Sequence, residues 1–294
     1  MADESSKIPE KTVEQIFDER YPLDKWEDSN YSILDKFSMR GRKGFVTGAA
    51  GGLGRNAAAA LAQAGADVAL VDLPSQEDKL TELAKDMSER FGTNVIALTC
   101  DVTNVEQVAE LKTQLVEQLG TVDFAFLNAG VNVPGDDQDA TEEVWTRTIN
   151  INLNGTYRTG RIAHEIMREH GHGGSLIFTA SLSGHNANYM MGSPTPVNAY
   201  GATKAAIMEH SRYLAVALAK DGIRSNTISP GYVWSGIFNG RIDLPGHDAM
   251  LEVVPMHRFG TNDEIASTVL FLASDASSYV TGIDIRVDGG YSVF

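Results

Sequence analysis

The sequence predicts an α/β fold, a doubly wound parallel sheet with helices on both faces. Two observations lead to this prediction. From residue 44 onward, short runs rich in Val, Ile and Leu alternate with longer segments of helical period. The runs are apolar on both faces, which is typical of parallel strands buried beneath helices.

Seven strands and six helices are expected, with right-handed crossovers between parallel strands. The length of 294 residues suits one α/β domain with a sizeable core. We therefore expect a single catalytic domain at 41–294. Residues 1–40 are expected to be an N-terminal extension, either wrapped on the domain or a partner subunit or forming a mobile tail. The predicted strands are 45–47, 67–72, 95–99, 122–128, 175–180, 224–229 and 283–287, and the predicted helices are 53–64, 77–91, 105–119, 142–169, 199–220 and 262–272.

Composition excludes several classes of function. The formal charge of −15 disfavours contacts with nucleic acid and anionic lipid, which need clustered Lys and Arg. No apolar run reaches the roughly 18–20 residues of a membrane span, and the N-terminus lacks the features of a secretory signal. Cys100 is the only cysteine, so no intrachain disulfide is possible. We expect a cytoplasmic protein without nucleic-acid or membrane partners.

The loop after the first predicted strand is rich in glycine. Residues 47–54 read Thr-Gly-Ala-Ala-Gly-Gly-Leu-Gly, and a helix rich in alanine follows. Glycines here permit a tight turn and let the backbone approach a pyrophosphate, which binds the free N–H groups of the helix N-terminus. A turn without a ligand is the alternative, but the position between strand and helix favours a Rossmann-like dinucleotide site. The candidate residues are Gly48, Gly51, Gly52, Leu53 and Gly54.

Acidic and amide side chains end the next predicted strands. Asp72 ends the second strand, where a carboxylate accepts hydrogen bonds from the adenosine ribose and repels a 2′-phosphate. This favours NAD over NADP, although Asp72 could instead cap a helix. In such sheets, ligands bind at the carboxyl ends of the strands. The residues at these ends could therefore contact the cofactor, or they could instead close the loops. The candidates at these ends are Asp72, Leu73, Asp101, Val102, Asn128, Ala129 and Gly130.

Tyr200 and Lys204 lie one helical turn apart on the same face of a predicted helix. A phenol that works near neutral pH needs its pKa lowered from about 10, at a cost of about 4 kcal/mol. A nearby ammonium and a cationic nicotinamide both act in that direction. Tyr200 would then be the base in alcohol oxidation and the acid in ketone reduction, while Lys204 holds the nicotinamide ribose.

Two further polar residues complete a candidate catalytic set. Ser181 follows the fifth strand, where its hydroxyl can hold the substrate oxygen. Asn152 lies in the segment Ile-Asn-Ile-Asn-Leu-Asn-Gly at 149–155, which indicates a distorted helix with a free carbonyl, able to bind a water that links Lys204 to solvent. Each pattern occurs by chance, so the prediction depends on their combination.

These motifs together resemble the short-chain dehydrogenase/reductase family from about Gly44 to the C-terminus. The resemblance implies a seven-stranded Rossmann fold, a small helical lid, a dimer or tetramer, and an Asn-Ser-Tyr-Lys tetrad. It also places residues 230–235 against the nicotinamide and its phosphates. The motifs that carry the resemblance are the glycine loop, Asn-Ala-Gly at 128–130, Asn152, Ser181, Tyr200, Lys204, Pro230, Gly231 and the segment 282–290. The cofactor contacts that it implies also include Val233 and Ser235.

Two departures from the family pattern leave alternatives open. Because Gly51 and Gly52 are both present, the loop also fits the glycine spacing of an extended branch that acts on nucleotide sugars. In addition, Ser181 and Tyr200 are separated by an unusually long segment, so that Ser183 could replace Ser181 if that segment shifts it.

The sequence leaves the substrate open between a polyol or ketose and a hydroxysteroid-like cyclic alcohol. Segments at 255–258 and 276–282 resemble polyol and ketose reductases, whereas the lid and the inserted loop carry bulky apolar side chains. No metal site is expected, because no His and carboxylate spacing fits one. A nucleotide-sugar epimerase or dehydratase with tightly held NAD, or a non-catalytic NAD-binding scaffold, remains an alternative. The candidate substrate contacts are Ser183, His185, Met190, Met191, Trp234 and Phe238; for His185 a surface or structural role is favoured over a substrate contact.

Overall fold

The computed structural model describes residues 32–188, 196–235 and 247–293. The chain divides into a short unit that ends at Lys36 and a second unit, Phe37–Phe294. The described part of the first unit, residues 32–36, includes most of a 3₁₀ helix, η3 (Ile33–Phe37). The fold and the site below belong to the second unit. No helix in the described part of the chain is long and apolar enough to cross a membrane.

The second unit contains the seven-stranded parallel sheet that the sequence predicts. The strand order is β3-β2-β1-β4-β5-β6-β7, so the chain runs outward from β1 and then returns to place β4 on its other side. This reversal opens a crevice at the carboxyl ends of β1 and β4, where such sheets bind ligands. The strands are β1 (Lys43–Thr47), β2 (Asp67–Asp72), β3 (Val95–Thr99), β4 (Phe124–Leu127), β5 (Gly174–Thr179), β6 (Ile223–Pro230) and β7 (Asp284–Val287).

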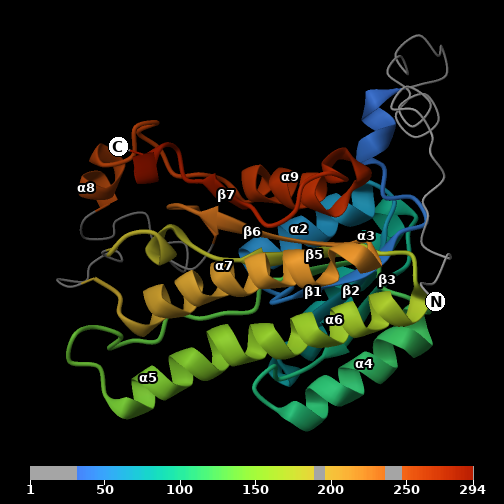
Figure 1. Ribbon diagram of the computed structural model, residues 1–294, viewed down its shortest axis with the longest axis horizontal. Helices are drawn as coiled ribbons and strands as arrows, with labels where there is room; N and C mark the ends of the chain where they lie inside the picture. Colours follow the sequence, from blue (N-terminus) through green and yellow to red (C-terminus); the bar gives the residue numbers. More distant parts are fainter. Residues whose placement is uncertain (1–31, 189–195, 236–246, 294) are drawn as a thin grey trace, which may run out of the picture. The chain divides into compact units, whose positions relative to one another are not determined.

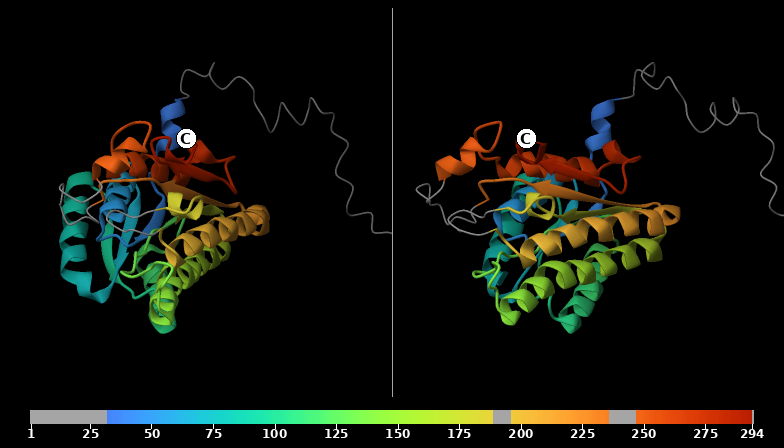
Figure 2. Two further views of the ribbon diagram at one scale, coloured as in Figure 1. Left: turned by 90° about the vertical axis from the view of Figure 1, so that its left-hand side faces the viewer. Right: turned by 60° about the vertical axis from the view of Figure 1, so that its left-hand side comes forward.

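Helices cover both faces of the sheet, as Figures 1 and 2 show. Successive residues of a strand point to opposite faces; Val46 packs in the core on one side, and Phe45 packs in the core on the other. Helices α2 (Gly52–Gln63), α3 (Glu77–Phe91) and α9 (Asn262–Ala273) cover the first face, and α4 (Val105–Leu119), α6 (Thr156–His170) and α7 (Ala199–Leu218) cover the second.

The long helix predicted at 142–169 is interrupted. It begins as α5 (Glu142–Ile149), becomes a π-helix, η5 (Asn150–Gly155), and continues as α6. The wider turn of a π-helix changes which backbone groups pair, and such turns occur often at functional sites. The expected distortion around Asn152 is therefore present. The remaining short elements are η4 (Pro74–Gln76), η6 (Leu182–Gly184), η7 (Ala219–Asp221), α8 (His247–Glu252), η8 (Asp275–Ser277) and η9 (Tyr291–Val293).

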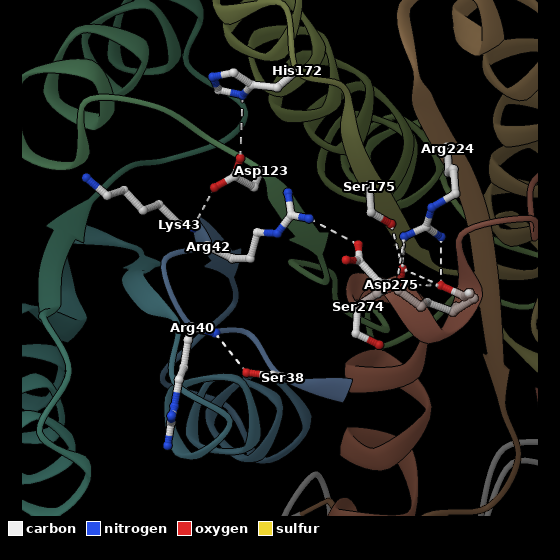
Figure 3. Close-up of polar contacts among 12 residues, drawn as sticks. Ser38, Arg40, Arg42, Lys43, Asp123, His172, Ser175, Arg224, Ser274 and Asp275 are labelled. Carbon is white, nitrogen blue, oxygen red and sulfur yellow. Dashed lines mark hydrogen bonds and ion pairs between the residues drawn. The ribbon is translucent and has the colours of Figure 1, made fainter. Parts of the chain in front are cut away.

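Polar contacts close the edge of the sheet where the strands begin (Figure 3). The backbone N–H of Lys43 donates to the Asp123 carboxylate at 2.8 Å, which ties the start of β1 to the start of β4. Arg224, at the start of β6, donates to the carbonyl of Leu272 at 2.8 Å and to the hydroxyl of Ser277 at 2.8 Å. Burial lowers the pKa of Arg224 to about 10.

Candidate active site

A pocket of about 840 Å³ lies at the carboxyl edge of the sheet. It extends from Asp72 at the end of β2 to Tyr200 and Lys204 on α7. Its lining includes most of the residues predicted to bind a dinucleotide, namely Gly48, Gly51, Gly52, Leu53, Asp72, Leu73, Asp101, Val102, Asn128, Ala129, Gly130 and Ser235.

The geometry of the glycine loop shows which glycines are required. Gly48 has a φ of +68°, a conformation that strongly favours glycine. A Cβ on Gly52 would overlap the carbonyl oxygen of Ser235, and a Cβ on Gly54 would overlap that of Gly48. At Gly51 the closest atom to such a Cβ would be the Gly48 oxygen at 3.3 Å. The close contacts thus select the spacing Gly48-x-x-x-Gly52-x-Gly54 over the alternative that uses Gly51.

Asp72 is held facing the glycine loop. Its two carboxylate oxygens accept hydrogen bonds from the N–H groups of Ala50 at 2.9 Å and Leu73 at 2.8 Å. Lys79, which the sequence did not single out, lines the same part of the pocket and donates to the Ala50 carbonyl at 2.8 Å. The carboxylate is thus fixed at the end of β2, with lone pairs left for a ligand.

The next strand ends combine loop closure with pocket lining. One oxygen of Asp101 accepts from the N–H and the hydroxyl of Thr103 at 2.9 and 2.7 Å. The hydroxyl of Thr47 accepts from the N–H groups of Asn128 and Ala129 at 2.9 and 3.0 Å, which fixes the loop after β4 to β1. Loop closure, one of the two roles considered from the sequence, is therefore present, and these residues also line the pocket.

Lys204 is buried beneath the pocket floor. Only 3% of it is exposed, its ammonium donates to the Thr179 carbonyl at 2.7 Å, and it lies 5.4 Å from the centroid of the Tyr200 ring. Burial lowers the pKa of Lys204 to about 8, because a charged ammonium is poorly solvated there. The predicted pair thus shares one face of α7.

Ser181 lies beside Tyr200. Burial raises the pKa of the Tyr200 phenol above its usual value, and the hydrogen bond with Ser181 offsets part of that rise. In the protein alone, the pKa of Tyr200 is therefore raised and not lowered, contrary to what the sequence argument expected from Lys204. The hydroxyl of Ser183 is engaged elsewhere, because it accepts from the side chain of Asn188 at 3.0 Å. Ser181 thus acts on the phenol, whereas the Ser183 hydroxyl is bonded to Asn188.

Asn152 acts on the backbone of the loop that follows β4. Its side chain accepts from the N–H of Val131 and donates to the carbonyl of Val131, both at 2.8 Å. Its own carbonyl, expected to hold a relay water, accepts from the hydroxyl of Thr156 at 2.7 Å, which occupies one of its two lone pairs. Asn152 is fully buried, so its position is fixed.

A second, smaller pocket of about 110 Å³ adjoins the first and shares Leu53, Thr179, Tyr200 and Ser235 with it. Pro230, Gly231 and Val233, expected from the resemblance to flank the nicotinamide, line this small pocket and not the large one. Sequence reasoning missed Asn188 and Tyr232, which also line this pocket and are joined by a 2.7 Å hydrogen bond. No local motif marked either residue.

Several predicted substrate contacts lie elsewhere or outside the described residues. His185 turns toward β6 and β7, where its Nε2 lies 2.9 Å from the Asp284 carboxylate and 3.3 Å from the Ser229 hydroxyl. This placement argues against the expected substrate contact and favours the structural role that competed with it. Trp234 packs against Phe259 and lines neither pocket. Met190, Met191 and Phe238 fall in segments that the structure does not describe.

Comparison with known proteins gives the class of the chain. A family model described as "Enoyl-(Acyl carrier protein) reductase" matches residues 48–292. The chain belongs to the short-chain dehydrogenase/reductase family.

Individual relatives narrow the comparison. The chain is 40% identical to the sorbose reductase of Schizosaccharomyces pombe over 88% of this chain and 99% of that one. It is 38% identical to a probable NADP-dependent mannitol dehydrogenase of Yarrowia lipolytica, over 88% and 91% of the two chains. The crystal structure of a short-chain dehydrogenase/reductase from Mycobacterium marinum matches with a TM-score of 0.82 at 36% identity, covering 88% and 99%.

Proposed function

We propose that the protein interconverts a polyol and its ketose with NAD(H), and that Tyr200 is the general acid and base. The observation that carries this proposal is the position of Tyr200, which lines both the large dinucleotide-sized pocket and the small one, with the Lys204 ammonium 5.4 Å from its ring centroid and Ser181 in the lining of the small pocket. The relatives named for sorbose and mannitol support the substrate class.

The pocket fits a nicotinamide dinucleotide on its own geometry. Side chains are excluded at Gly52 and Gly54, so the backbone can approach a pyrophosphate at the start of α2. The fixed carboxylate of Asp72 suits a free ribose 2′-hydroxyl and would repel a 2′-phosphate, which supports NAD, although the mannitol relative is named for NADP. When bound, the cofactor supplies or accepts the hydride.

The chain's own residues would bind the substrate and move its proton. The Ser181 hydroxyl holds the substrate oxygen, and the Tyr200 Oη takes the alcohol proton in oxidation or returns it in reduction. Because burial raises the pKa of the phenol, the positive charges of Lys204 and of the oxidised nicotinamide must offset that rise in the working complex. Lys204 has the position for this role, one turn along α7.

The substrate class rests on the relatives named for sorbose and mannitol. The small pocket has a mixed lining, with the polar side chains of Ser183, Asn188 and Tyr232 beside the apolar ones of Leu182, Val233 and Met250. The close contacts at Gly52 and Gly54 support the short-branch glycine spacing and thus weigh against a nucleotide-sugar epimerase. The placement of Ser181, Tyr200 and Lys204 around the two pockets weighs against a non-catalytic scaffold.

The test is an NAD⁺ reduction screen over mannitol, sorbitol, arabinitol, hydroxysteroids and cyclohexanol, run in parallel with NADP⁺. We expect turnover of at least one polyol with NAD⁺ preferred. The variant Tyr200→Phe should lose at least about 100-fold in kcat and still bind NADH, as loss of a general acid predicts. Near-normal turnover by this variant would refute the role of Tyr200, and a preference for NADP⁺ would refute that of Asp72.

A further inference from the structure

Asn188 joins three segments that are far apart in the sequence. The residue is 2% exposed and belongs to the lining of the small pocket. Its Oδ1 accepts hydrogen bonds from the phenols of Tyr232 at 2.7 Å and Tyr291 at 3.4 Å, and its Nδ2 donates to the Ser183 hydroxyl at 3.0 Å. The loop after β6, the C-terminal turn η9 and the turn η6 therefore meet at one amide group.

These contacts fix the orientation of the Asn188 amide. Burial, and then the neighbouring Tyr291, raises the pKa of the Tyr232 phenol, so this phenol keeps its proton and donates it. The two phenols occupy both lone pairs of the amide oxygen, and the NH₂ group faces Ser183. The backbone is held as well, because the Asn188 carbonyl accepts from the N–H of Val197 at 3.0 Å. Asn188 thus holds the Ser183 side chain from a fixed position.

Ser183 in turn holds the hydroxyl oxygen of Ser181. The Ser183 N–H donates to the Ser181 Oγ at 3.1 Å, and the Gly184 N–H donates to the Ser181 carbonyl at 2.9 Å. On the other side, a Cβ added to Gly201 would lie 2.8 Å from the Ser183 carbonyl oxygen, so α7 packs directly against this turn. Because its side chain is bound to Asn188, Ser183 cannot turn its N–H away from Ser181 without breaking that bond. Successive hydrogen bonds therefore lead from the two phenols to the Ser181 hydroxyl.

The orientation of Ser181 affects both the phenol and the substrate oxygen. Burial raises the pKa of Tyr200, and the hydrogen bond with Ser181 offsets part of that rise. A Ser181 hydroxyl that was free to turn away would offset less of it and would hold the substrate oxygen less well. We propose that Asn188 is a positioning residue, which acts through Ser183 to keep the Ser181 hydroxyl directed at the reacting centre. The inference rests on the proposed function, in which Ser181 holds the substrate oxygen.

The experiment measures the pH dependence of kcat for oxidation of the best substrate of the screen by Asn188→Ala, Ser183→Ala and the double variant. Each single variant removes one partner of the same hydrogen bond. We expect kcat to fall about 3- to 10-fold, in line with loss of one hydrogen bond, and the apparent pKa of the profile to rise by about 0.5–1 pH unit. The double variant should lose no more than the weaker single variant. The Kd for NADH should stay within about twofold, because neither residue lines the large pocket.

The matched controls are Asn94→Ala and Ser278→Ala, the same changes at exposed residues that line neither pocket; both should keep the wild-type profile. Ser183→Ala removes a single oxygen and decides the question if Asn188→Ala does not fold. A wild-type profile in Ser183→Ala, additive effects in the double variant, or a lower kcat with an unchanged apparent pKa would each overturn the inference and leave the proposed function in place. Wild type that oxidises no alcohol of the screen refutes the proposed function itself.

Discussion

The N-terminus of the catalytic helix α7 depends on a carboxylate that is distant in the sequence. Asp136 is 6% exposed, and its two oxygens accept hydrogen bonds from the N–H groups of Ala199 and Tyr200 at 2.7 and 2.8 Å. The first N–H groups of a helix have no partner within the helix, and a negative charge there also interacts favourably with the helix dipole. The informative perturbation is Asp136→Asn, which keeps the size and shape of the side chain.

The expected loss of stability follows from the hydrogen bond that asparagine cannot accept. Its carbonyl oxygen can accept from one of the two N–H groups, while its NH₂ group faces the other. A buried N–H left unpaired costs about 1–3 kcal/mol, and loss of the charge at the helix N-terminus costs about 0.3–1 kcal/mol. We expect the free energy of unfolding to fall by about 2–3 kcal/mol. Because one of the N–H groups belongs to Tyr200, kcat should also fall by at least about tenfold.

The assay is urea unfolding followed by circular dichroism at a fixed protein concentration, with kcat measured on the same samples. The matched control is Asp137→Asn, which removes the charge from the adjacent residue, whose carboxylate contacts only the N–H of Asp139 among the described residues. The control should change the free energy of unfolding by no more than about 0.5 kcal/mol. An Asp136→Asn variant as stable as the control would refute the capping argument.

Two further predictions concern the buried ammonium and the glycine loop. Because the pKa of Lys204 is about 8 when folded and 10.5 otherwise, the unfolded chain holds a proton that the folded protein lacks between these values. Relative to Lys204→Met, wild type should therefore gain roughly 3 kcal/mol in the free energy of unfolding as the pH rises through this window. The measurement is urea unfolding of both proteins at about pH 7.5 and about pH 10. If the ammonium were well solvated, the difference between the two proteins would not change with pH. Gly52→Ala should raise the Kd for NADH at least about tenfold, because the new Cβ would overlap the Ser235 carbonyl. In the control Gly51→Ala, the Kd should stay within about threefold of wild type. Equal effects of the two substitutions in a fluorescence titration would contradict the assignment of close contacts.

The sequence predicted the elements whose periodicity is strong. The bounds of β2, β3, α3 and α4 match the expected ranges, because an uninterrupted apolar pattern defines each of them. At Asn150–Gly155 the sequence predicted a distortion but not a π-helix. Asparagines and a glycine weaken an α-helix, but they do not specify which backbone hydrogen bonds replace its own.

Contacts made by loops were beyond the reach of the sequence. Asp136 and Tyr200 are 64 residues apart, and no spacing rule links a loop carboxylate to a helix N-terminus at that distance. For His185 the sequence favoured a surface or structural role over a substrate contact, but it could not name the partner. The Nε2 of His185 lies 2.9 Å from the Asp284 carboxylate, 99 residues away in the chain, because a buried imidazole requires hydrogen-bond partners.

The segment between Val131 and Asp136 links two features that the sequence treats as separate. Among the described residues, the Asn152 side chain forms no hydrogen bond with Tyr200 or Lys204, but it binds the backbone of Val131. At the other end of the segment, Asp136 binds the backbone N–H of Tyr200. The π-helix η5 thus acts on the reacting residues through this segment. Loss of the contacts at either end frees the same segment. The effects of Asn152→Ala and Asp136→Asn on kcat should therefore be less than additive in the double variant.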